Sequence, residues 1–141
     1  MTRSLGKATV AGLTATAAMT LLMVMAPKIG MPKMDIGAML ASKMGGVPAL
    51  GWAAHFMIGI VLALVYALAF QRRLPGAGFV RGAVFALVPW LVAQLVVMPM
   101  MGMGLFSGSV AMAGGSLMGH LVYGTVLGGI LGVPECSGSC A

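Results

Sequence analysis

The only two histidines of the chain, His55 and His120, are the side chains best suited to holding a ligand. Each is followed four positions later by a glycine, Gly59 or Gly124. After one further residue, a valine and a leucine follow in both places. Imidazoles bind transition metals and can be the axial ligands of a b-type haem. The glycines would leave room beside them for a flat macrocycle. A second interpretation is that each histidine only hydrogen-bonds to a neighbouring helix and stabilises helix packing.

Methionine supplies the next candidate ligands, with 15 in the chain. The stretch MPMMGM is the densest group, and it contains Met98, Met100, Met101 and Met103. Thioethers are soft ligands that suit Cu(I). Methionine is also a flexible apolar filler, and its close spacing here favours filling or an interface. We therefore expect no cofactor as the first interpretation, with haem b or copper as the alternatives.

The two cysteines, Cys136 and Cys140, lie beside Glu135 in the tail formed by residues 134–141. Two thiolates and a carboxylate could bind zinc or iron, but a complete site would need further ligands from elsewhere. No disulfide framework holds the body of the chain together. A cap or a partner contact is the simpler interpretation of this tail.

Catalytic residues are missing from the apolar parts of the sequence. The two acidic residues are Asp35, in a loop, and Glu135, in the tail. There is no serine–histidine–acid set and no phosphate-binding loop. We therefore expect that the protein is not an enzyme.

The elements that position these residues are predicted to be membrane-spanning helices. The chain is 60% hydrophobic and 7% charged, whereas soluble domains average about 25% charged residues. Four apolar segments approach the roughly 20 residues that cross a bilayer as a helix: residues 8–26, 49–70, 79–98 and 114–133. The predicted fold is an all-α integral membrane four-helix bundle, with residues 1–133 as one transmembrane domain.

Charge identifies the lipid bilayer, and not nucleic acid, as the partner of this surface. The formal net charge is +6, but the basic residues are scattered at segment ends and form no stripe with aromatic residues. The N-terminus and the loop between the second and third segments lie on one side of the membrane and carry five basic residues: Arg3, Lys7, Arg72, Arg73 and Arg81. The first and third loops lie on the other side and carry three: Lys28, Lys33 and Lys43. The side with more basic residues is usually cytoplasmic. This predicts a multi-pass protein of the bacterial inner membrane with both termini cytoplasmic.

Repeated phrases indicate an internal duplication. PKIGM at 27–31 matches PMMGM at 99–103, and paired glycines at 45–46 match those at 114–115. The His-x-x-x-Gly motifs follow in the same order. Each unit holds two spans, which predicts two parallel two-helix repeats related by a pseudo-twofold axis along the membrane normal. His55 and His120 would then lie at the same depth.

Small residues spaced for close helix packing occur on the first and last predicted helices. Those expected to pack are Gly12, Thr16, Thr20, Gly59, Gly124, Gly128 and Gly132. Pro89 should disturb the third helix by removing a backbone donor. Gln94 is polar at membrane depth and needs a hydrogen-bond partner.

The first outer loop can form a short interfacial helix. Asp35 can cap it, and Ile36, Met39 and Leu40 would share one face. An irregular loop is the alternative.

Several stretches together resemble a family of small four-span bacterial inner-membrane proteins whose function is unknown. They are AGLTATAAMTLLMVMAP, DIGAML, GWAAHFMIGIVLALVYAL, LPG, RGAVFALVPWLVAQLVVMPMMGMGLFSG and GHLVYGTVLGGILG. The resemblance covers residues 8–133 and implies a membrane class but no activity.

The sequence favours a non-enzymatic accessory or structural subunit of a larger inner-membrane complex, with other membrane proteins as partners. The alternative is a haem b or copper protein that uses His55 and His120. A second alternative is a small-solute channel or carrier, whose polar path would need the threonines, Gln94 and the histidines.

Overall fold

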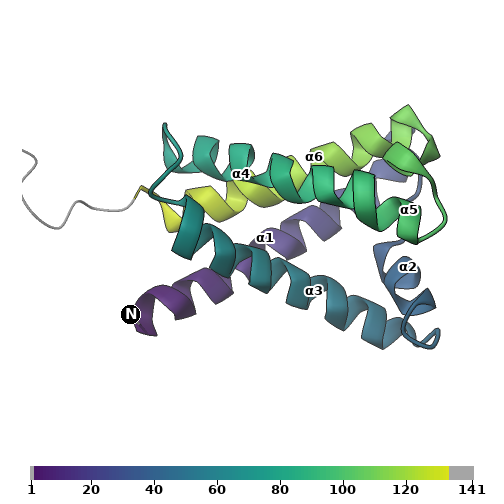
Figure 1. Cartoon of the computed structure of the whole chain (residues 1–141), viewed down its shortest axis with the longest axis horizontal. Coiled ribbons are helices and arrows are strands. Elements are labelled where there is room, and N and C mark those ends of the chain that lie inside the picture. The colour runs from purple at the N-terminus through teal and green to yellow at the C-terminus, as the bar shows by residue number, and fades with distance from the viewer. Residues whose placement is uncertain (1, 134–141) are drawn as a thin grey trace, which may run out of the picture.

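The computed structural model describes residues 2–133, and within that range it contains helices and no strands, which confirms the all-α fold class (Figure 1). Six α-helices follow in order: α1 (Thr2–Met25), α2 (Ile36–Ser42), α3 (Pro48–Val65), α4 (Gly78–Val92), α5 (Met98–Met100) and α6 (Val110–Leu131). Two π-helical turns follow α3 and α4, at Tyr66–Phe70 and Ala93–Val97, and the second leads directly into α5. Short 3₁₀ segments cover Ala26–Ile29 and Leu105–Gly108.

Four of the described helical stretches are long and apolar enough to span a membrane, as expected. They are Leu5–Ile29, Pro48–Phe70, Gly78–Met100 and Val110–Leu131. The first three contain the expected spans. The fourth lies a few residues earlier than expected, because α6 ends before Gly132, whose φ of 69° does not continue a helix. The chain is therefore a multi-pass membrane protein.

The bundle is built around α1 and α6. The helix α3 packs on α1, α4 packs on α6, and α1 and α6 contact each other. In Figure 1, α3 and α4 approach at the end where the chain begins and diverge towards the end that carries α2 and α5, here called the α2 end. Their main contact is at the π-helical turn after α3, so the interface between α3 and α4 is loosely packed along most of its length.

The tightest packing joins α4 to α6 through glycines. A methyl group added at Gly82 would collide with the carbonyl oxygen of Gly124, and one at Gly78 would lie 2.5 Å from the carbonyl oxygen of Gly128. Backbone atoms meet directly at these positions, as small-xxx-small patterns allow in membranes. The pair Gly78 and Gly82 was not singled out from the sequence, although its spacing matches that of Gly124 and Gly128.

A second glycine crossing joins α1 to α3. A methyl group at Gly12 would lie 2.8 Å from the Ala63 Cβ and 3.0 Å from the Gly59 carbonyl oxygen. A methyl group at Gly59 would in turn collide with the Thr16 hydroxyl. Gly12, Thr16 and Gly59 therefore pack where the sequence pattern placed them.

Pro89 lies inside α4, and the helix widens into its π-helical turn four residues later. Proline lacks the N–H that would bond to the preceding turn, and π turns occur where regular helical bonding is interrupted. Gln94 lies in this turn and is fully buried. The local change in helical geometry therefore accompanies a polar side chain that faces the protein interior.

The expected short helix in the first outer loop is α2. The Asp35 carboxylate accepts a hydrogen bond of 2.8 Å from the Ala38 N–H and caps the helix. Gly37 allows α2 to lie against Trp52 and Gly51 of α3. This contact fixes α2 at one end of the open α3–α4 interface.

Candidate functional site

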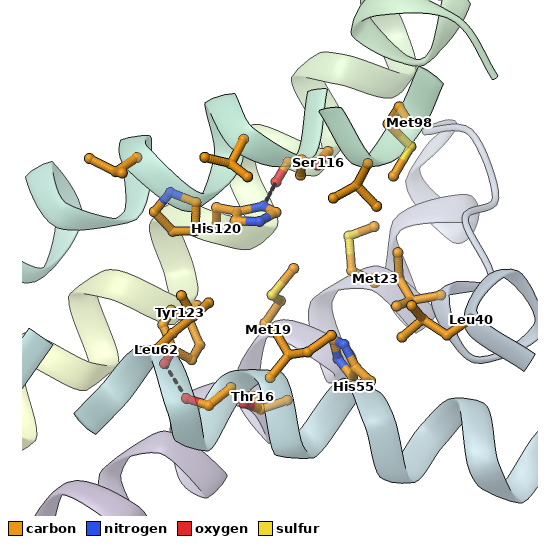
Figure 2. A pocket seen from close by; sticks show the side chains of 18 of the residues that line it. Thr16, Met19, Met23, Leu40, His55, Leu62, Met98, Ser116, His120 and Tyr123 are labelled. Carbon is orange, nitrogen blue, oxygen red and sulfur yellow. Dashed lines mark hydrogen bonds between the residues drawn. The ribbon is translucent and has the colours of Figure 1, made fainter. Parts of the chain in front are cut away.

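A cavity of about 350 Å³ lies between α3 and α4, with α1 and α6 at its back (Figure 2). His55 of α3 and His120 of α6 both line it, so the structure brings the two candidate ligands to one site. At the α2 end the lining is completed by Ile36, Met39 and Leu40. Apart from the histidines, Thr16, Ser116 and Tyr123, the lining residues are apolar.

The cavity opens sideways, towards the space that lipid would occupy. Ile58 of α3 and Val88 and Val92 of α4 line it, yet their side chains remain 48%, 49% and 50% exposed. These residues stand on the two helices that diverge. An apolar molecule dissolved in the bilayer could enter between α3 and α4 without crossing water.

His120 is held by its own helix. Its Nδ1 lies 2.8 Å from the carbonyl oxygen of Ser116, one turn earlier (Figure 2). A carbonyl oxygen can only accept, so Nδ1 carries the proton. In a neutral imidazole the other nitrogen, Nε2, then has a free lone pair.

His55 is hydrogen-bonded to Thr20 of α1. The Thr20 hydroxyl donates to the Thr16 carbonyl oxygen at 2.8 Å, and the same hydroxyl oxygen lies 3.1 Å from Nε2 of His55. Because the hydroxyl has one proton and has donated it, it accepts from His55 Nε2–H. The lone pair of the neutral imidazole is therefore on Nδ1. Thr20, expected to be a packing residue, also sets the tautomer of His55.

Both remaining imidazole nitrogens lack a hydrogen-bond partner in the described part of the chain. Among the residues whose placement is described, the Tyr66 hydroxyl alone is a fully buried side-chain polar atom without a partner. Neither Nδ1 of His55 nor Nε2 of His120 has a hydrogen-bond partner there, yet neither is sealed in the protein. Both residues line the cavity, which is the nearest space where a ligand could meet these nitrogens.

A polar chain supports His120 from behind. The Ser107 hydroxyl donates to Gln94 Oε1 at 2.9 Å, and Gln94 Nε2 donates to the Ser116 hydroxyl at 3.2 Å. The expected partner of Gln94 is therefore present. Ser107 and Phe106 have φ values of 58° and 51°, in the left-handed region that non-glycine residues rarely adopt. This series of hydrogen bonds connects the loop before α6, the π-helical turn, and Ser116, whose carbonyl oxygen binds His120.

The methionines of MPMMGM do not all lie at this site. Met98 and Met101 line the cavity, Met100 is 74% exposed and outside the lining, and Met103 is also outside it. Four other methionines complete a thioether-rich wall: Met19, Met23, Met34 and Met39. Met19 and Met23 lie between the two histidines in Figure 2.

The remaining predicted residues divide between packing and the tail. Gly128 packs on Gly78, and the backbone of Gly132 would lie 3.0 Å from a methyl group at Gly78. Cys136 and Cys140 lie outside the described residues. Within residues 2–133, no group of three or more His, Cys, Asp or Glu side chains could hold a metal ion.

Sequence reasoning missed Tyr123 and Ser116. The Tyr123 hydroxyl donates to the Gly59 carbonyl oxygen at 2.6 Å and ties α6 to α3 across the back of the cavity. Ser116 precedes His120 by four residues, which is the spacing that places its carbonyl beside the ring. That spacing was visible in the sequence and could have identified Ser116.

The internal repeat remains a prediction; glycine contacts occur within both halves of the chain, but the contacts between the halves differ. Gly12 meets Gly59 where α1 crosses α3, and Gly82 meets Gly124 where α4 crosses α6. In a twofold arrangement, α1 would be equivalent to α4 and α3 would be equivalent to α6. The α3–α4 interface would then be equivalent to the α1–α6 interface. Instead α1 and α6 are packed while α3 and α4 are open. The cavity occupies the interface at which the two halves differ.

The fold defines a four-span membrane protein with an intramembrane cavity. A family model described as "Family of unknown function (DUF6789)" matches residues 2–136, so the chain belongs to this family. No curated protein and no solved structure matches the chain.

Proposed function

We propose that the protein binds a small lipid-soluble organic molecule, which enters the cavity from the bilayer between α3 and α4. The observation that carries this proposal is the cavity of about 350 Å³ whose lining includes half-exposed side chains of both helices. Ligand sites commonly span about 300–1,000 Å³ and combine apolar walls with a few polar groups. The two imidazoles are such polar groups.

The helix interfaces support entry between α3 and α4, because direct contacts join the other neighbouring helices. Glycine crossings close α1–α3 and α4–α6, and the Tyr123 hydrogen bond closes α6–α3 at the back. Among the described spans that are neighbours around the bundle, α3 and α4 alone lack comparable packing. An apolar molecule in this cavity would gain dispersion contacts with its walls, so its binding would stabilise the bundle.

The test is extraction and mass spectrometry of small molecules carried by protein purified in mild detergent. Val92→Trp should fill the mouth of the cavity and remove the bound molecule. Val96→Trp is the matched control: Val96 is 49% exposed, close to the 50% of Val92, but does not line the cavity. We expect the wild type and Val96→Trp to carry the same molecule in near-stoichiometric amount.

Equal amounts of every extracted compound in the wild type and both variants would overturn the proposal. Extraction of bulk phospholipid alone from the wild type would do the same.

The role of accessory subunit remains a prediction beside this proposal. The spans Pro48–Phe70 and Gly78–Met100 are only 22% buried within the bundle, so they leave surface for lipid or for another membrane protein. Co-purification of a second protein in fixed ratio would support it. The absence of enzymatic activity and the location in a bacterial inner membrane also remain predictions.

A further inference from the structure

The structure points to the class of molecule that the cavity takes: we propose that it binds a diphenol, such as the reduced form of a membrane quinone, through O–H groups donated to His55 and His120. This inference rests on the proposed function. It follows from the state of the two imidazoles, each of which has already used its N–H on the protein.

The donor and acceptor pattern selects the ligand. His120 Nδ1–H is taken by the Ser116 carbonyl oxygen, and His55 Nε2–H is taken by the Thr20 hydroxyl. The nitrogens that remain can only accept hydrogen bonds. A quinone carbonyl also only accepts, so it would place lone pairs against lone pairs. The O–H groups of the reduced diphenol donate, and they match both histidines.

The rest of the cavity suits an apolar ring. Met19, Met23 and Phe85 line it, and thioethers pack favourably at the edges of aromatic rings. The mouth beside Val88 and Val92 would let an alkyl or isoprenoid tail remain in the bilayer. A diphenol therefore satisfies the polar groups, the apolar walls and the lateral opening together.

A soft metal ion or a haem fits these observations less well. Imidazoles and thioethers are neutral, so a Cu(I) complex would keep its positive charge within an apolar wall that contains no carboxylate. A haem brings two propionates, and no lysine or arginine is among the residues that line the cavity. A bare ion would also leave most of about 350 Å³ empty.

The experiment measures binding to wild-type protein in lipid nanodiscs by isothermal titration calorimetry, under anaerobic conditions. Three probes of similar shape are compared: menadiol, its dimethyl ether, which cannot donate, and the quinone menadione. Nanodiscs that carry Val92→Trp correct for partition into lipid. We expect menadiol to bind about tenfold more tightly than either of the other probes, since an unmatched buried acceptor is costly.

Variants assign the effect to the two histidines. His120→Leu and His55→Leu should each weaken menadiol binding by about tenfold and leave the dimethyl ether unaffected. Thr20→Val should reduce the preference for menadiol, because it frees His55 to change tautomer. Ile130→Leu is the matched control on α6, since Ile130 is 36% exposed and outside the cavity lining.

The outcomes separate the two proposals. Equal binding of menadiol and its dimethyl ether would overturn the diphenol inference and leave the cavity as a general apolar site. Failure of all three probes to bind would overturn the inference, and only the extraction experiment would then decide the proposed function. A Soret band or stoichiometric copper in the purified protein, lost in His120→Leu, would replace the diphenol with a haem or copper site.

Discussion

The Tyr123 hydroxyl donates a hydrogen bond of 2.6 Å to the Gly59 carbonyl oxygen, one turn after His55, and so joins the two helices that carry the histidines. The acceptor belongs to a backbone that is already in contact with Thr16 of α1. Three helices therefore meet at one carbonyl group. The histidines are positioned relative to each other by this contact and not by the open side of the cavity.

Tyr123→Phe should destabilise the bundle by about 1 kcal/mol, because it deletes one buried hydrogen bond while preserving the ring. Tyr66→Phe is the matched control, since the Tyr66 hydroxyl is buried without a partner in the described part of the chain. Its removal should be neutral or stabilising. Thermal unfolding in detergent measures both. Equal destabilisation by the two variants would contradict the structure at this site.

Gly124→Ala should destabilise the protein by about 1–3 kcal/mol, because the new methyl group would collide with the backbone of Gly82 and neither side can yield. Gly129→Ala, on the same helix, meets nothing within 4 Å and should not lower stability. Resistance of the bundle to unfolding in denaturing detergent reports the difference. The α4–α6 crossing would be wrong if Gly124→Ala were as stable as Gly129→Ala.

Four spans and the α2 helix could be predicted from the sequence because hydropathy, length and capping are local properties. The matching His-x-x-x-Gly motifs drew attention to His55 and His120, and both line the cavity; the internal repeat itself stays a prediction. The cavity itself could not be predicted, because α3 and α4 both carry apolar faces and nothing local distinguishes a packed face from an open one. Met19 and Met23 belong to the site only because α1 packs behind it.

Ser107→Ala should destabilise the protein by about 1–3 kcal/mol, because Gln94 Oε1 would lose its donor inside the bundle while the left-handed backbone at position 107 stays strained. Ser109→Ala is the control, since the Ser109 side chain makes no capping hydrogen bond to α6. The same unfolding assay compares them. Similar stabilities would show that the polar chain behind His120 contributes nothing.

Orientation can be tested with the native cysteines. If both termini are cytoplasmic, a membrane-impermeant maleimide should label Cys136 or Cys140 in inside-out vesicles and not in right-side-out vesicles. In a chain whose two native cysteines are changed to serine, Ser42→Cys at the exposed end of α2 should give the reverse pattern. Labelling from the same side in both experiments would refute a four-span topology.

The opening between α3 and α4 has a mechanical consequence. At the end of the bundle opposite α2, the Arg81 side chain donates to the carbonyl oxygens of Gln71 and Gly76, and the Gln71 amide donates to those of Leu131 and Gly132. If a bound molecule separates α3 from α4, these bonds should restrict the separation to the α2 end. A thicker bound molecule would then move α3 and α4 apart most at the α2 end. The positions of α2 and of the loop after α5 would change with the size of that molecule. The position of these two segments at the membrane surface would thus depend on whether the cavity is occupied.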